Sequence, residues 1–224
     1  TGINNEYGKN LIGSFYQPDC VISDINLLSS LPKREIICGY GEILKHSLIS
    51  NKNTFKYLDK YKLNILNLES PYIEKAILDS CKIKKKIVQM DEKEKNLRKV
   101  LNLGHTFAHA YEATLNYSKK LNHGEAVILG IKTAVKFSLT EKILSKKNYD
   151  NINAHIHSLK IDKKYINIIK KRNLKKILNF MGTDKKNISK KINLILLKDI
   201  GKPKINLNFK IGKIKNFFLK QLIN

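Results

Sequence analysis

The run that most restricts the fold is GEAVILGIKTAVKFSLTEKIL, residues 124–144, which is apolar on nearly every side of a helix. A helix that is hydrophobic all round is stable only where other elements cover it. Lys132 and Lys136 interrupt the run, and the chain holds no stretch near the roughly 20 apolar residues of a membrane span. We therefore expect a central core helix with the rest of the chain packed around it.

Other parts of the chain carry weaker helical patterns, with apolar residues at helical spacing. They cover residues 31–50, 71–94, 98–115 and, as shorter Lys- and Asn-rich helices, 145–180. Strand signals lie near the two ends, in CVISD (20–24) and KINLILLKDIG (191–201), and a last helix is expected over residues 209–224. The fold class is thus predicted to be mainly α, with a few short strands near both ends.

The chain is strongly basic, with 43 Lys and Arg against 19 Asp and Glu and a formal net charge of +24 over 224 residues. Such a charge invites a nucleic-acid-binding interpretation. However, arginine, which makes bidentate contacts to bases and phosphates, occurs only at Arg34, Arg98 and Arg172. We interpret most of the lysine excess as compositional background that can still attract an anionic substrate, and we expect no nucleic-acid partner.

Cys20, Cys38 and Cys81 are odd in number and irregular in spacing, and no CxxC pair is present. This pattern argues against a disulfide framework and against a thiolate zinc site. No signal peptide or membrane span is visible, so we expect a cytoplasmic protein without membrane association. The chain starts TGINNEYGKN, without Met, and we interpret it as a fragment of a longer protein.

The first candidate site lies in LNLGHTFAHAYE, residues 101–112. On a helix His105, His109 and Glu112 fall at i, i+4 and i+7, along one stripe. Three groups that bind metals or protons could converge there. The alternative is that the histidines are ordinary core residues with satisfied hydrogen bonds.

Two further segments supply groups of the same kind. GYGEILKH contains Glu42 and Lys45, and HGEA places His123 and Glu125 at the start of the apolar helix. Glu42, His105 and His123 would make a set of two imidazoles and one carboxylate, which suits Zn²⁺ with an open coordination position. Spacing alone cannot assemble ligands from separate helices, so satisfied core polar groups stay an open alternative.

Four blocks occur in order along the chain: GKNLIGSFYQP, GYGEILKHSLI, DEKEKNLRKVLNLGHTFAHAYE and HGEAV. Together they resemble the 3-dehydroquinate synthase family, from Gly2 to about Gly201. The resemblance implies the multi-helix C-terminal domain of that fold. It also implies that Glu42, His105 and His123 are metal ligands.

The resemblance assigns further roles by position. Glu94 and His109 correspond to proton-transfer residues, and Glu112 is left to orient a neighbour. The expected substrate contacts are Lys9, Asn10, Lys45, Lys84, Arg98, Asn102 and Lys186, with Lys185 as the alternative to the last. The expected NAD⁺-lining residues are Leu27, Leu28, Ser29 and Ser30. No family role falls on His46, His155 or His157.

The implied activity is a lyase reaction of the shikimate pathway, which leads to chorismate and the aromatic amino acids. It converts 3-deoxy-arabino-heptulosonate 7-phosphate to 3-dehydroquinate and phosphate. The family uses Zn²⁺ or Co²⁺ as Lewis acid and template, and NAD⁺ that oxidises a ring hydroxyl and is regenerated. The resemblance also implies that the protein is a homodimer.

The family's dinucleotide-binding half, with its Gly-rich phosphate turn, has no counterpart in this sequence. We therefore expect residues 1–30 to be a remnant of, or linker from, that domain and residues 31–224 to be the helical metal- and substrate-binding domain. We also expect the isolated chain to be inactive without the missing half. Two alternatives stay open: another sugar-phosphate cyclase of the same superfamily, or a basic nucleic-acid-binding protein with steeply salt-dependent affinity.

Overall fold

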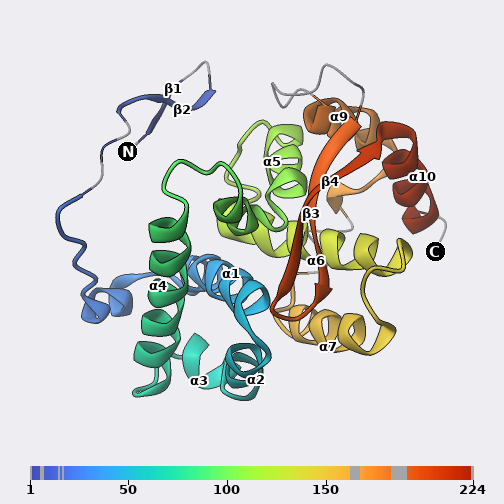
Figure 1. The fold of residues 1–224 in the computed structure, drawn as a ribbon. Helices are drawn as coiled ribbons and strands as arrows, with labels where there is room; N and C mark the ends of the chain where they lie inside the picture. Colours follow the sequence, from blue (N-terminus) through green and yellow to red (C-terminus); the bar gives the residue numbers. More distant parts are fainter. Residues whose placement is uncertain are drawn as a thin grey trace. The chain divides into compact units, whose positions relative to one another are not determined.

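The computed structural model describes residues 2–5, 8–14, 16, 18–161, 167–182 and 191–222. It divides into two compact units, Thr1–Ser30 and Leu31–Asn224. The fold of each is drawn in Figure 1. Within the described residues, no helix combines the length and the apolar character needed to cross a membrane.

The first unit contains a small antiparallel ladder and one 3₁₀ helix. Strands β1 (Ile3–Asn5) and β2 (Gly8–Ile12) pair with each other, and η1 spans Ile25–Ser30. Asp24 caps η1, since its carboxylate accepts a hydrogen bond from the backbone N–H of Asn26 at 2.9 Å. The strand predicted over residues 20–24 is wrong: this segment is irregular and exposed, and it pairs with no strand among the described residues, so its backbone joins no ladder there.

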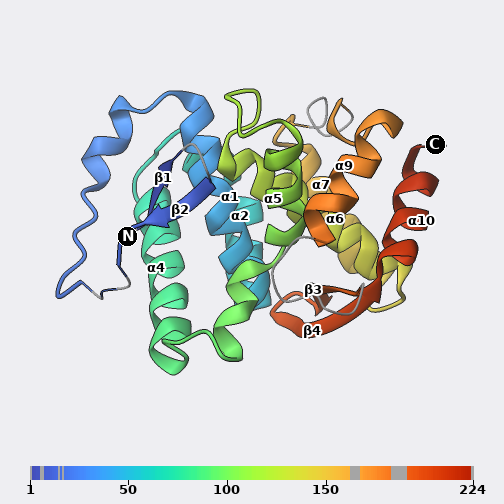
Figure 2. The same ribbon diagram turned by 90° about the horizontal axis from the view of Figure 1, so that it is seen from above.

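The second unit opens with four helices. They are α1 (Lys33–Ser50), α2 (Lys52–Lys60), α3 (Lys62–Leu66) and α4 (Tyr72–Met90). Asn51 separates the first two, and its side chain accepts a hydrogen bond from the backbone N–H of Thr54 to cap α2. Viewed from above, α1 lies between α4 and the helices α5 and α6 described next (Figure 2).

The helix predicted over residues 98–115 is two elements. A 3₁₀ helix, η2 (Leu97–Asn102), is followed by α5 (His105–Thr114). Gly104 separates them with a φ of 81°, a left-handed conformation that glycine adopts without a steric cost. The chain therefore turns immediately before His105.

Helix α6 (His123–Thr140) is the predicted core helix. Its Val127, Ile128, Leu129 and Ile131 are fully buried. Helices α1, α5 and α7 (Lys146–His157) pack against α6, as does the hairpin that crosses it in Figure 1. The expectation of a mainly helical fold around this segment is confirmed.

The C-terminal part contains a second antiparallel hairpin. Helix α9 (Lys171–Gly182) precedes β3 (Lys191–Asp199) and β4 (Lys202–Lys210), and α10 (Ile211–Leu222) follows. Strand β3 was predicted from the sequence, whereas β4 was not. The turn is held at Gly201, whose φ is 81° and whose N–H donates to the Leu48 carbonyl at 2.7 Å.

Candidate metal centre and its pocket

Helices α1 and α6 meet at two glycines, one beside each of two predicted ligands. A Cβ atom on Gly124 would lie 2.3 Å from the Cα of Cys38, and one on Gly41 would lie 2.8 Å from the Gly124 carbonyl oxygen. Both distances are shorter than real Cβ contacts, so only glycine permits this approach. Because Glu42 follows Gly41 and His123 precedes Gly124, the contact brings these two side chains to the same place.

Helix α5 approaches α6 in the same way. A Cβ atom on Gly130 would lie 2.2 Å from the carbonyl oxygen of Gly104, and one on Gly104 would lie 2.6 Å from the backbone nitrogen of Ile131. His105 follows Gly104 as the first residue of α5. The predicted ligands on all three helices therefore adjoin glycines that set the distance between helices.

The three predicted metal ligands converge. One donor atom each from Glu42, His105 and His123 lies within 4.8 Å of the other two. Glu42 Oε1 lies 3.8 Å from His105 Nε2, and the imidazole centroids of His105 and His123 are 5.7 Å apart. One carboxylate and two imidazoles form a donor set that fits Zn²⁺ or Co²⁺.

Lys45 shapes the charge of this cluster. Its Nζ lies 2.6 Å from Glu42 Oε2. Burial favours a higher pKa for Glu42, but the charge and hydrogen bond of Lys45 outweigh it, and the net effect holds the carboxyl's pKa below its ordinary value. Burial, with the charge of Lys45, lowers the pKa of His105 to about 3. Both groups are thus in their metal-binding forms at neutral pH.

Glu112 contacts His123, the third predicted ligand. Its carboxylate is buried in α5, and its Oε2 lies 3.2 Å from Nδ1 of His123. His109, Glu112 and His123 also bring donor atoms within 4.8 Å of one another, so His123 belongs to both possible groups. A carboxylate on one nitrogen of an imidazole fixes its tautomer and leaves the other nitrogen for a metal.

The loop between α4 and η2 presents Glu94. Asp91 organises this loop, and its carboxylate accepts hydrogen bonds from the backbone N–H groups of Lys95, Asn96 and Arg98. These bonds lower the pKa of Asp91. Glu94 has a φ of 53° and accepts a hydrogen bond from the Asn102 amide at 2.6 Å.

A pocket of about 390 Å³ surrounds the cluster. It is lined by Glu42, Lys45, His46, Lys84, Glu94, Arg98, Leu101, Asn102, His105 and His123. All the predicted ligands and the predicted substrate contacts Lys45, Lys84, Arg98 and Asn102 are therefore around one hollow.

An adjoining pocket of about 610 Å³ shares Glu94, Asn102 and His105 with the first. His109 lines this second pocket, so the two predicted proton-transfer residues, Glu94 and His109, border the same space. The far wall comes from the hairpin, through Asn193, Ile195, Asn206 and Asn208. The half of this wall on β4 was not predicted from the sequence, although Ile205, Leu207 and Phe209 alternate with polar residues as in a strand.

The remaining predicted residues belong to the first unit or lie outside the described residues. Lys9 and Asn10 belong to β2 and Leu27–Ser30 to η1, in the first unit; the side chains of Lys9 and Asn10 are outside the described part. Lys185 and Lys186 also lie outside the described residues. These assignments stay predictions.

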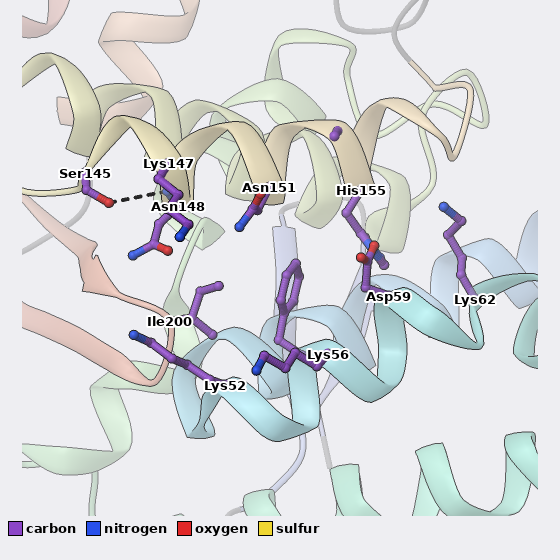
Figure 3. A pocket seen from close by; sticks show the side chains of 12 residues that line it. Lys52, Lys56, Asp59, Lys62, Ser145, Lys147, Asn148, Asn151, His155 and Ile200 are labelled. Carbon is purple, nitrogen blue, oxygen red and sulfur yellow. Dashed lines mark hydrogen bonds and ion pairs between the residues drawn. The ribbon is translucent and has the colours of Figure 1, made fainter.

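Two of the histidines without an assigned role, His46 and His155, have structural partners. His46 is buried and pairs its Nδ1 with the Ser80 hydroxyl at 2.6 Å. His155 is buried between Asp59, 2.7 Å from Nδ1, and the Tyr40 hydroxyl, 2.9 Å from Nε2. Asp59 and His155 border a pocket of about 700 Å³ between α2 and α7, which contains no predicted site residue (Figure 3).

Comparison with known families identifies the family of the chain. Residues 39–187 match the family described as 3-dehydroquinate synthase C-terminal, and residues 1–38 match 3-dehydroquinate synthase N-terminal. The chain belongs to the 3-dehydroquinate synthase family. The 3-dehydroquinate synthase of Pelagibacter ubique is 58% identical over 222 residues, which cover 99% of this chain and 60% of the relative. That of Alkaliphilus metalliredigens is 41% identical over 88% of this chain and 54% of the relative.

This member of the 3-dehydroquinate synthase family thus spans about 60% of the Pelagibacter relative's length. Its fold is also that of two solved sugar-phosphate cyclases. A 2-deoxy-scyllo-inosose synthase, complexed with carbaglucose-6-phosphate, NAD⁺ and Co²⁺, has a TM-score of 0.78 at 25% identity, over 98% of this chain and 61% of that one. A 2-epi-5-epi-valiolone synthase from Streptomyces hygroscopicus, with NAD⁺ and Zn²⁺ bound, has a TM-score of 0.81 at 18% identity, over 100% and 61%.

Proposed function

We propose that this chain supplies the metal- and substrate-binding part of a 3-dehydroquinate synthase. The reaction converts 3-deoxy-arabino-heptulosonate 7-phosphate to 3-dehydroquinate and phosphate. The observation that carries the proposal is the convergence of Glu42, His105 and His123 beside a pocket lined by Lys45, Lys84 and Arg98. The 58% identity to the Pelagibacter enzyme, against 25% or less to the two other cyclases, favours this substrate over theirs.

A divalent cation fits the donor set of Glu42, His105 and His123. When bound, it would polarise substrate oxygens as a Lewis acid and hold them in position. Lys45 keeps Glu42 ionised through Oε2, while Oε1 faces His105. The carboxylate thus has one oxygen directed toward the ligand cluster.

The cationic side chains account for recognition of the substrate's two anionic groups. Arg98 is oriented by a hydrogen bond from its guanidinium to the Glu92 carbonyl. Lys84 lines the same pocket, on the last turns of α4. A phosphate and a carboxylate require several such donors, because a desolvated anion is costly unless it is paired. Lys9, Asn10 and Lys186 complete the proposed set.

Glu94 and His109 are the proposed proton-transfer pair. Glu94 is held by Asn102 at the border of both pockets, and His109 faces the second one. A carboxylate and an imidazole on the same space can remove a proton at one substrate atom and return it at another. Glu112 is proposed to act on His123 and not on the substrate.

The remaining features of the proposal rest on kinship with the family. NAD⁺ would supply the hydride chemistry, with Leu27–Ser30 contributing to its lining. Both serine hydroxyls of this segment donate to backbone carbonyls within η1, Ser29 to Asn26 and Ser30 to Leu27, which leaves their oxygens able to accept. A cytoplasmic homodimer is the expected form.

The test joins this chain to the part of the Pelagibacter enzyme that precedes the matching region. With NAD⁺ and Zn²⁺ or Co²⁺, we expect release of phosphate from 3-deoxy-arabino-heptulosonate 7-phosphate and formation of 3-dehydroquinate. The chain by itself and the fused Glu42→Gln variant should release none, and glucose 6-phosphate, which lacks the carboxylate, should be a poor substrate. A fused protein that binds both NAD⁺ and metal yet leaves the substrate intact contradicts the proposal.

A further inference from the structure

The first turn of α6 is bound to the first turn of α1 by four side chains, here called the helix clamp: Arg34, Glu35, Asn122 and Glu125. Arg34 donates from Nε to Glu125 Oε1 at 2.9 Å and from Nη2 to Glu125 Oε2 at 2.7 Å. Asn122 donates from Nδ2 to Glu35 Oε1 at 2.5 Å. The clamp thus joins residues about ninety positions apart in the sequence.

The same groups also cap α6. Glu125 Oε2 accepts a hydrogen bond from the backbone N–H of Asn122 at 2.9 Å, which forms the capping box of this helix. The Glu125 side chain is only 4% exposed, whereas Arg34 is 39% exposed. A buried carboxylate with a bidentate guanidinium partner is geometrically restricted, because both oxygens are fixed at once.

His123 is the first residue of α6, between the two clamped residues Asn122 and Glu125. Its side chain is 46% exposed and bonds to Glu112, so its position depends on the backbone of a helix end. Helix ends fray unless their orphan N–H groups and flanking residues are held. The helix clamp restrains the first turn of α6, the helix end that carries the predicted ligand His123.

Helix α1 carries both the clamp and a ligand. Arg34 and Glu42 lie eight residues apart on this one helix, which corresponds to roughly 12 Å along its axis. Arg34 fixes the start of α6 at one point, and the contact of Gly41 with Gly124 fixes it at a second. Two points of attachment between two rigid elements define how far Glu42 stands from His123.

We infer that Arg34 is a positioning residue, which acts through Glu125 to hold His123 in register with Glu42 for binding of a divalent cation. This inference rests on the proposed function, because it assumes that the cluster binds a metal. It adds a residue that belongs neither to the proposed ligand set nor to the lining of the pocket around it. Arg34 should therefore affect metal affinity and geometry beyond its effect on stability.

The test is a Co²⁺ titration of the 224-residue chain, followed by the visible absorption of the bound ion, at a temperature where each variant is folded by circular dichroism. Arg34→Met removes the guanidinium group, and Arg34→Lys keeps the positive charge without the bidentate geometry. Loss of a group that orients a ligand typically lowers metal affinity about 10- to 100-fold. We expect a loss in that range for Arg34→Met, a smaller loss for Arg34→Lys and an altered spectrum for both.

The matched control is Asp199→Asn, which removes the ion pair of 2.8 Å between Lys52 and Asp199 at the end of β3. Lys52 lines a different pocket from the metal cluster. The Asp199→Asn substitution should lower stability and leave the Co²⁺ affinity unchanged. Equal affinities for Arg34→Met and the unaltered chain overturn the inference, and so does an equal loss in Asp199→Asn. If Arg34→Met does not fold, Arg34→Lys and Glu125→Gln are compared with the same control. An unaltered chain that binds no Co²⁺ instead overturns the metal site of the proposed function.

Discussion

The two oxygens of Glu42 have different neighbours. Oε2 bonds to Lys45 and Oε1 faces His105, so the ion pair need not break when a cation is bound by the other oxygen. Burial lowers the pKa of Lys45 more than Glu42 raises it, yet the ammonium has a carboxylate partner at 2.6 Å. A buried charge is tolerated only with such a partner, which accounts for a lysine inside the metal-binding helix.

Glu112 gives a test of ligand orientation at the level of one atom. Replacing it by Gln keeps the shape but removes the negative charge 3.2 Å from His123 Nδ1. We expect Glu112→Gln to bind Co²⁺ about 10- to 100-fold more weakly, because His123 loses the group that fixes its tautomer and ring. Isothermal titration would measure this; unchanged affinity would show that Glu112 has only a packing role.

His46 makes stability depend on pH. Burial, together with the Lys45 charge, lowers its pKa to about 4, against 6.5 for an ordinary histidine. The unfolded chain therefore takes up the proton first, so the stability present above pH 6.5 is lost as the pH falls toward 4. Between these limits the loss is on the order of 3 kcal/mol. Urea unfolding from pH 7 to pH 4.5 should show a smaller fall for His46→Asn than for the unaltered chain.

At the scale of elements, the fold depends on close contacts between helices that no local sequence pattern predicts. Gly104 ends the helix that periodicity predicted over residues 98–115, because the backbone there must approach Gly130 of α6. The strand predicted at residues 20–24 has apolar β-branched residues, but within the described part of the chain no strand pairs with it. Helix cores and apolar faces could be predicted from local patterns, whereas these outcomes depend on partners distant in sequence.

Two glycine-to-alanine substitutions should distinguish a position that tolerates a side chain from one that does not. Gly130→Ala places a methyl group 2.2 Å from a backbone oxygen of the neighbouring helix, so we expect destabilisation of about 3 kcal/mol or more. Gly39→Ala, in α1, meets no atom within 4 Å and should stabilise the helix by up to about 1 kcal/mol. Urea unfolding of both variants gives the comparison, and a loss for Gly39→Ala similar to that of Gly130→Ala would contradict this account of the crossing.

At the scale of the molecule, the candidate site is assembled from segments up to about eighty residues apart, Glu42 on α1 and His123 on α6. Motif resemblance could name these residues, but their convergence depends on the crossings of α1 and α5 over α6. The pairing of Arg34 with Glu125 could not be predicted from spacing or periodicity, because each residue taken alone has the pattern of a surface charge. Half of the hairpin wall of the second pocket, Asn206 and Asn208, was likewise not predicted, because β4 was not recognised as a strand.

A metal that bridges three helices should therefore stabilise the whole second unit. Binding to the folded state alone adds about 2.7 kcal/mol when the free ion is at a hundred times its dissociation constant. For a chain of this size that corresponds to a rise in the unfolding midpoint of roughly 5–10 °C. We expect this rise on adding Zn²⁺ or Co²⁺ to metal-free chain, its reversal by a chelator, and its absence in Glu42→Gln. Scanning calorimetry of both proteins provides the measurement. An equal rise in Glu42→Gln would mean that the ion binds elsewhere, because that variant removes the carboxylate that connects α1 to the two histidines.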